Sequence, residues 1–197
     1  MNNYQYIHNE IESSIAVKQS ILADERLLCD IEHAANVVTE AYRKGYKTLL
    51  AGNGGSAADA QHLAGEFVSR FYFDRPGIPS VALTTDTSIL TAISNDYGFE
   101  RLFARQIQAQ GYAGDVFIGI STSGNSPNIV EAFKECKKKG IFSIGFTGSN
   151  PCAMDTLCDI CIKVPSCCTP RIQESHIMIG HIICSIVERE LFGENKN

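Results

Sequence analysis

The sequence of 197 residues has no excess of positive charge. Lysine and arginine number 17 against 22 aspartates and glutamates, the net charge is −5, and no basic stripe is present. A protein that binds nucleic acid by neutralising phosphates normally carries the opposite sign. We therefore expect no nucleic-acid partner. The charged fraction of 20% and the hydrophobic fraction of 44% are those of an ordinary globular domain.

Long apolar runs are also missing. No window of about 18 uninterrupted apolar residues occurs, and the richest segment, residues 177–187, contains His181 and Ser185. The first ten residues have neither the basic start nor the apolar centre of a signal peptide. We therefore expect no membrane partner and a cytoplasmic location.

Two nucleotide-binding motifs are absent or incomplete. No Gly-x-x-x-x-Gly-Lys-Ser/Thr segment exists, which excludes an NTP P-loop. Gly52, Gly54 and Ala57 match a relaxed dinucleotide motif, but Asp74, the acid about 20 residues on, follows a helical segment and not a strand. This position argues against a nicotinamide cofactor.

Cysteine is abundant, and five of the eight cysteines fall in residues 152–168. Their spacing allows a zinc cluster or disulfides. Cys158, however, alternates with apolar residues up to Val164 as one face of a predicted strand, which places Cys161 on the other face. Thiols on opposite faces cannot share a tetrahedral metal, and a reducing cytoplasm disfavours disulfides. We therefore expect small, buried apolar side chains.

From residue 46 onward, short apolar runs alternate with helical segments. The predicted strands are residues 48–51, 80–84, 116–120, 142–146 and 158–164. The predicted helices between and after them are residues 57–70, 99–110, 127–139 and 171–191. This alternation predicts an α/β fold: a doubly wound, mostly parallel five-stranded sheet flanked by helices. Residues 46–192 form this core of a single domain, residues 1–197.

Residues 1–45 are predicted to be an N-terminal helical extension. Ile7, Ile11 and Ile15 repeat every four residues, and a second helix begins after the N-cap candidate Asp24 and ends at Gly45. Two helices ahead of an α/β unit can cover the sheet or contact another subunit. We expect them to form an oligomer contact.

Two loops have the composition of anion sites. Residues 52–56, Gly-Asn-Gly-Gly-Ser, form what we call the glycine loop, and residues 121–126, Ser-Thr-Ser-Gly-Asn-Ser, form the serine loop. Each lies between a predicted strand and a helix, where free N–H groups attract anions. The dense hydroxyls of the serine loop, without a lysine, suit a phosphomonoester such as a sugar phosphate.

Two predicted helices carry metal-ligand types. His62 and Glu66 lie on one helix face, and Gln173 and His181 are about 12 Å apart along the last helix. The four could hold one zinc ion, although a His–Glu pair at this spacing is more often a surface contact. Spacing leaves two further candidates on the last helix, Glu174 and His176.

These segments together resemble the phosphoheptose isomerases, also called sedoheptulose 7-phosphate isomerases, of the sugar isomerase (SIS) domain family. The resemblance is carried by residues 52–66, 94–96, 121–126 and 171–176 with His181, and it extends to about Phe192. It implies a cytoplasmic homotetramer with one zinc per subunit. The implied reaction converts D-sedoheptulose 7-phosphate to D-glycero-D-manno-heptose 7-phosphate through an enediol, the first step towards the nucleotide-activated heptose of lipopolysaccharide.

The resemblance also implies roles for individual residues. The phosphate is held by Ser121, Thr122, Ser123 and Ser126. The remainder of the substrate contacts Asn53, Gly54, Gly55, Glu66, Asn95, Asp96 and Gln173. The zinc ligands are His62, Glu66, Gln173 and His181. Glu66 and His181 are the implied catalytic pair for proton transfer.

Two alternatives remain open at this point. A non-catalytic SIS relative that binds a replication initiator has similar loops, but it lacks the acid and the histidine that stand here at Glu66 and His181. The second alternative is an isomerase of another sugar phosphate, such as a pentose or hexose phosphate. One departure from the family pattern is Pro170, where some members have aspartate.

Overall fold

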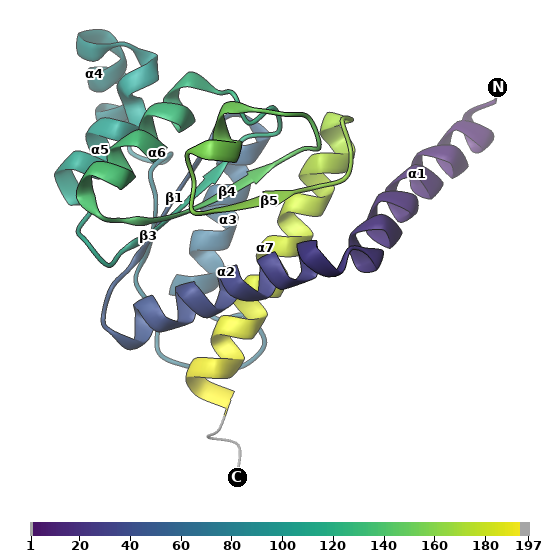
Figure 1. The fold of residues 1–197 in the computed structure, drawn as a ribbon, viewed down its shortest axis with the longest axis horizontal. Coiled ribbons are helices and arrows are strands. Elements are labelled where there is room, and N and C mark those ends of the chain that lie inside the picture. Colours follow the sequence, from purple (N-terminus) through teal and green to yellow (C-terminus); the bar gives the residue numbers. More distant parts are fainter. Residues whose placement is uncertain (1, 194–197) are drawn as a thin grey trace.

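The structure is a computed structural model that describes residues 2–193. Five parallel strands form one sheet in the order β2-β1-β3-β4-β5 (Figure 1). The strands are β1 Thr48–Gly52, β2 Ser80–Ala82, β3 Val116–Ile120, β4 Phe142–Thr147 and β5 Ile160–Lys163. The predicted doubly wound α/β fold is confirmed, and every strand in the sheet is parallel.

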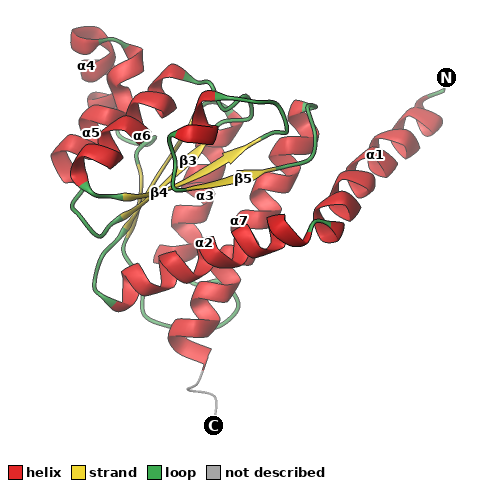
Figure 2. Cartoon of the chain, viewed as in Figure 1, coloured by secondary structure: helices red, strands yellow, loops and turns green. Residues whose placement is uncertain are grey.

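Helices cover both faces of the sheet (Figure 2). The α-helices are α1 Asn3–Ala23, α2 Glu25–Arg43, α3 Gly55–Val68, α4 Thr87–Tyr97, α5 Leu102–Gln110, α6 Pro127–Lys139 and α7 Thr169–Phe192, and the short 3-10 helices are η1 Phe99–Arg101 and η2 Ala153–Thr156. Alternate residues of β3 point to opposite cores. Ile118 packs on the side of α2, α3 and α7, whereas Phe117 packs on the side of α5 and α6.

The N-terminal extension consists of two different helices. In α2, Asp24 accepts the Leu27 N–H at 3.0 Å, and Gly45 follows with φ +80°, so the predicted start and stop are confirmed. In α1, Ile21 is buried, whereas Ile7, Ile11 and Ile15 are exposed. Figure 1 shows α1 extending away from the body of the molecule.

The helix α4 is absent from the prediction. Leu90 and Ile93 have helical spacing and pack partly against the α5 and α6 core, but none of the residues of this helix is fully buried.

The prediction for the cysteine segment was wrong in two respects. Cys158 lies in a bend before β5, and its side chain packs with that of Cys161 on the α6 side of the sheet, opposite Ile160. The period of two does not extend through the bend, so the inferred separation of the two thiols fails. Cys167 and Cys168 are also exposed and not buried, and all eight cysteines are free thiols.

Within residues 2–193, none of the helices combines the length and apolar character needed to cross a bilayer.

Candidate functional site

The glycine and serine loops follow the two adjacent central strands of the sheet. The glycine loop leads from β1 into α3 on one face, and the serine loop leads from β3 into α6 on the other. In a sheet of order 2-1-3-4-5, the chain leaves β1 and β3 in opposite directions, which opens a crevice at their carboxyl ends. The two loops therefore meet at the position where such sheets bind ligands.

The three glycines of the glycine loop occupy positions that disfavour a side chain. A Cβ placed on Gly52 would lie 2.3 Å from the carbonyl oxygen of Ser56, and Gly54 has φ +55°. A Cβ on Gly55 would lie 2.8 Å from Nε2 of Gln173. The loop therefore brings its backbone directly against the Gln173 side chain of α7.

A pair of amides joins the glycine loop to α6. Asn53 Nδ2 donates to Asn128 Oδ1 at 2.9 Å, and Asn128 Nδ2 donates to Asn53 Oδ1 at 2.8 Å. Asn128 is buried, and the sequence prediction did not include it. The available signal was an asparagine directly after Pro127, in the first turn of a helix behind an anion loop.

The serine loop gathers hydroxyl groups at the start of α6. Ser121 Oγ lies 2.9 Å from Ser126 Oγ and 3.5 Å from Ser123 Oγ. Gly124 adopts φ +64°, and its N–H donates to the carbonyl oxygen of Ser121 at 3.0 Å. Ser126, the N-cap residue of α6, makes no side-chain capping hydrogen bond within the described residues. Hydroxyls and helix N–H groups therefore converge where an anion is favoured.

Thr122 of the same loop is anchored through its backbone. Its carbonyl oxygen accepts the N–H of Gly148 at 3.2 Å, which ties the serine loop to the end of β4.

Histidine and carboxylate side chains from α3 and α7 meet in one cluster. His62 Nε2 lies 2.8 Å from His181 Nε2 and 3.1 Å from Glu66 Oε1. Among residues 2–193, these three form the one group of histidine, cysteine or acidic residues whose ligand atoms all lie within 4.8 Å of one another. The sequence analysis correctly predicted that these three side chains lie close together.

The donor set fits a zinc ion. Zinc accepts imidazole nitrogen and carboxylate oxygen at about 2.0–2.2 Å, so donors around one tetrahedral ion are roughly 3.3 Å apart. The two imidazole nitrogens face one another, and only one of them can carry the proton between them. His62, Glu66 and His181 are therefore suited as ligands of one zinc ion.

Asp59 borders this cluster and was missed from the sequence. It lies one turn before His62 on α3, and its Oδ2 is buried without a hydrogen-bond partner. Burial raises the pKa of this carboxyl, although His62 and His181 act in the opposite direction. Its spacing of three residues from His62 was the available signal.

The structure distinguishes among the three candidate metal ligands near the start of α7, which are Gln173, Glu174 and His176. Glu174 accepts the Ser14 hydroxyl at 2.7 Å and so faces α1. His176 is fully buried, with Nε2 3.2 Å from the carbonyl oxygen of Thr147. Neither belongs to the cluster, whereas Gln173 lies against the glycine loop.

A buried ion pair holds the segment that packs beside His181. Glu188 accepts the N–H groups of Phe71 at 2.8 Å and Tyr72 at 2.7 Å, and it pairs with Arg75 at 3.1 Å. Burial raises the pKa of Glu188, but these hydrogen bonds and Arg75 outweigh it and lower the pKa. The Phe71 ring lies 5.5 Å from the imidazole of His181, centroid to centroid.

Within one chain, Asn95 and Asp96 lie away from the cluster of His62, Glu66 and His181. Both are exposed at the end of α4, where Asn95 Nδ2 donates to Asp96 Oδ1 at 2.8 Å. α4 packs on the α5 side of the sheet, and in Figure 1 it lies far from α7.

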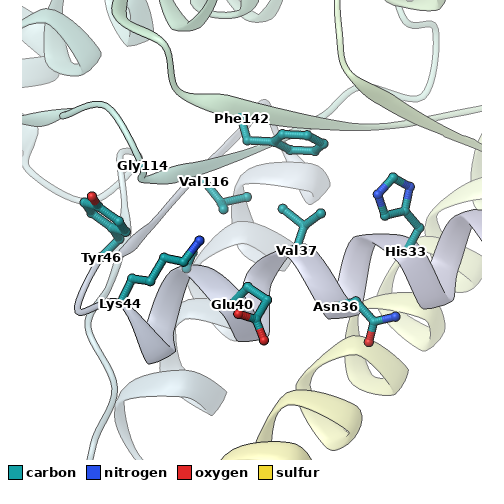
Figure 3. Close-up of a pocket in the computed structure, with 10 residues that line it drawn as sticks. His33, Asn36, Val37, Glu40, Lys44, Tyr46, Gly114, Val116 and Phe142 are labelled. Carbon is teal, nitrogen blue, oxygen red and sulfur yellow. The ribbon is translucent and has the colours of Figure 1, made fainter.

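Hollows also lie outside the two loops, and two of them concern the site. One, of about 420 Å³, opens beside His181 and is lined by Tyr72, Ile177, Met178, Ile182, Ser185 and Ile186. The other, of about 380 Å³, lies between α2 and the amino ends of the strands, at the far end of the sheet from the loops (Figure 3). Its lining includes His33, Val37, Lys44 and Phe142, and none of the predicted site residues.

Comparisons with known proteins agree with this arrangement. A sequence model of the SIS domain matches residues 12–148. The chain is 69% identical over 193 residues to phosphoheptose isomerase 2 of Campylobacter jejuni, with 98% of this chain and 96% of that protein covered. The structure of a phosphoheptose isomerase from Neisseria gonorrhoeae matches with a TM-score of 0.89 and 39% identity over 95% of this chain and 99% of that one. The phosphoheptose isomerase structure from Francisella tularensis matches with a TM-score of 0.91 and 35% identity over 96% and 100%.

Proposed function

The chain belongs to the SIS domain family, and we propose that it is a phosphoheptose isomerase, an enzyme that interconverts an aldose and a ketose. Its substrate is D-sedoheptulose 7-phosphate and its product is D-glycero-D-manno-heptose 7-phosphate. The observation that carries this proposal is the convergence of Glu66, His62 and His181 on one point, in a protein whose serine loop is built for a phosphate.

Binding is divided between the two loops. We assign the phosphate to Ser121, Thr122, Ser123 and Ser126, since their loop combines hydroxyls with the uncapped start of α6. The sugar is assigned to Asn53, Gly54, Gly55, Asn95, Asp96, Glu66 and Gln173. Holding the phosphate far from the reacting carbons supplies binding energy and orientation for the chemical step.

Proton transfer is assigned to Glu66 and His181. The reaction moves a proton between neighbouring carbons, so it needs a base over the carbon chain and an acid at the carbonyl oxygen. A carboxylate and an imidazole that both contact His62 satisfy the requirement for two such groups in one place. The Phe71 ring packs beside the His181 imidazole and helps to orient it.

We assign zinc, one per subunit, to His62, Glu66, Gln173 and His181. When bound, the ion supplies polarisation of the carbonyl and hydroxyl oxygens of the sugar. The two imidazole nitrogens and the carboxylate oxygen support this assignment, and Gln173, whose amide lies against Gly55, is included from the resemblance to the family.

The remaining assignments concern the setting of the enzyme. We propose that the chain acts as one SIS domain, with residues 46–192 as the core and residues 1–45 as a contact in a homotetramer. The exposed isoleucines of α1 support the contact. A cytoplasmic location and the supply of heptose for lipopolysaccharide complete the proposal.

The decisive experiment is proton NMR of the purified protein with sedoheptulose 7-phosphate in deuterated water. We expect new anomeric signals of an aldoheptose phosphate, with deuterium entering the carbon next to the carbonyl. A ketose spectrum that only broadens would contradict the enzyme and favour a binding protein. Turnover of a pentose or hexose phosphate in preference to the heptose would contradict the assigned substrate.

A further inference from the structure

Two thiols lie side by side on the face of the sheet that α6 covers. Cys161 of β5 pairs in register with Gly145 of β4, and residues in register on parallel strands point to the same face. Because Gly145 has no side chain, the thiol of Cys158 occupies that space: a Cβ on Gly145 would lie 2.9 Å from its Sγ. The bend before β5 therefore brings Cys158 back over the strand pair, beside Cys161.

The pair is accessible from solvent. Both thiols are half-buried, and both line a hollow of about 380 Å³ between β5 and α2. Arg26 and Lys163 line the same hollow, beside three aspartates. A small uncharged oxidant can therefore reach the thiols without unfolding of the sheet.

The two thiols differ in acidity. The contact with Cys161, helped by backbone N–H groups, lowers the pKa of Cys158 despite its burial. The same contact, together with burial, raises the pKa of Cys161. One thiol is thus disposed to react as the thiolate and the other to remain protonated, which is the division of an attacking and a resolving cysteine.

The two thiols are linked to the serine loop by a series of hydrogen bonds. In its protonated form, the Cys158 thiol donates to the carbonyl oxygen of Met154 at 3.0 Å. The N–H of Met154 donates to the carbonyl oxygen of Gly124 at 3.3 Å, and that of Ala153 donates to Asn125 Oδ1 at 2.9 Å. A change at Cys158 therefore acts on the residue that holds Gly124 in place.

We propose that Cys158 and Cys161 form a dithiol modification site that a hydroperoxide converts to an intramolecular disulfide, and that this disulfide weakens phosphate binding at the serine loop. The effect on phosphate binding rests on the function proposed above. Closing the disulfide removes the S–H donor from the Met154 carbonyl and draws η2 towards β5.

The chemistry balances with hydrogen peroxide as the oxidant. The Cys158 thiolate attacks one peroxide oxygen, the O–O bond breaks, and the leaving hydroxide is protonated to water, which leaves a sulfenic acid. The Cys161 sulfur then attacks the Cys158 sulfur, the S–O bond breaks, and a second water leaves with the thiol proton. Two thiols lose two protons and two electrons, and one peroxide takes them up to become two waters.

The site is tested by mass spectrometry of the full chain in which the exposed Cys29, Cys167 and Cys168 are replaced by serine. Peroxide is expected to remove the mass of two hydrogens, and peptide mapping to join Cys158 to Cys161. Cys158→Ser or Cys161→Ser should abolish the bond, whereas the neighbouring Cys152→Ser should retain it. A protein that loses no mass, or a bond that includes Cys152, overturns the proposal. If the serine background folds poorly, peptide mapping of the unsubstituted chain distinguishes the same outcomes.

The coupling is tested by calorimetry with sedoheptulose 7-phosphate on reduced and oxidised protein. Loss of one hydrogen bond in the chain to the loop predicts a Kd raised about three- to tenfold, restored by dithiothreitol. Equal affinities of the two forms would overturn the coupling. Reduced protein that does not bind the sugar would contradict the proposed function, while the mass measurement would still decide the dithiol site.

Discussion

At the scale of single residues, Glu66 is the group whose chemistry is most easily isolated. Its carboxylate is half-buried and contacts one imidazole, so replacement by glutamine keeps the shape but removes the base. We expect Glu66→Gln to lower kcat about 10²- to 10⁴-fold, the usual contribution of a positioned acid or base. Affinity for the sugar phosphate, measured by calorimetry, should change less than about threefold, the scale of one weak hydrogen bond. Glu32→Gln, at an exposed position on α2, is the matched control; near-normal turnover of the Glu66 variant would disprove the assignment.

His176 makes stability depend on pH. Burial lowers the pKa of its imidazole to about 4, whereas an unfolded chain has a histidine pKa of about 6.5. Below pH 6.5 the unfolded state takes up the proton and the folded state does not, so stability falls between about pH 6.5 and 4 and by about 3 kcal/mol at most.

Urea unfolding of the His176→Gln variant at several pH values measures this contribution. The variant should be less stable at pH 7.5 because a packed ring is lost, and its stability should fall less between pH 6.5 and 4 than that of the parent protein. His8→Gln, at an exposed position, should keep the parental slope. A parental slope in the His176 variant would contradict the prediction.

A site residue could be predicted from the sequence when its neighbours along the chain indicated its role. His62 and Glu66 lie one turn apart on a single helix, and His181 is a polar residue in an apolar run, so sequence alone marked all three. Asn128 acts through Asn53, a partner from elsewhere in the fold, and the burial of Asp59 beside the cluster depends on how α3 packs. The choice among Gln173, Glu174 and His176 depended on how α7 is rotated against the sheet, which spacing cannot give.

At the scale of elements, the central strands were the easiest to locate. Strands buried on both faces are continuous apolar runs, and β1, β3 and β4 appear in the sequence within one residue of their observed bounds. The errors in the predicted elements lie at the edge of the sheet and at the surface, where side chains are buried on one side or only in part. β5 was extended through a bend as far as Cys158, and α4, whose apolar side chains are only partly buried, was missed.

The segment between α3 and β2 depends on one carboxylate. Glu188 is 1% exposed and Arg75 2%, and removing one charge of a buried pair leaves the other without compensation. We expect Glu188→Gln to lower the free energy of unfolding by about 3 kcal/mol. Urea denaturation measures the loss, and Glu190→Gln, in an exposed pair with Arg189, should cost less than about 0.5 kcal/mol. Equal losses in the two variants would show that the buried pair has no special role.

At the scale of the whole molecule, α1 gives the clearest expectation. Its isoleucines at positions 7, 11 and 15 are between 48% and 57% exposed, and they form a stripe on a helix that extends from the body (Figure 1). A contiguous apolar stripe of this kind is typical of a contact between proteins. In the proposed tetramer, Ile11→Glu should therefore reduce the molecular mass measured by light scattering to that of smaller species. Ser13→Glu, on the other side of α1, should leave the assembly intact, and an unchanged mass for the Ile11 variant would exclude α1 from the contact.

The close contact of Gly52 with Ser56 has a thermodynamic consequence. With 2.3 Å between a hypothetical Cβ and the Ser56 carbonyl oxygen, the end of β1 and the first turn of α3 touch, so the glycine loop has no room to swing as a lid. Its conformational entropy is therefore lost when the chain folds and not when the sugar arrives. Ligand association at this loop should be limited by diffusion and desolvation, without a slow closing step in stopped-flow traces.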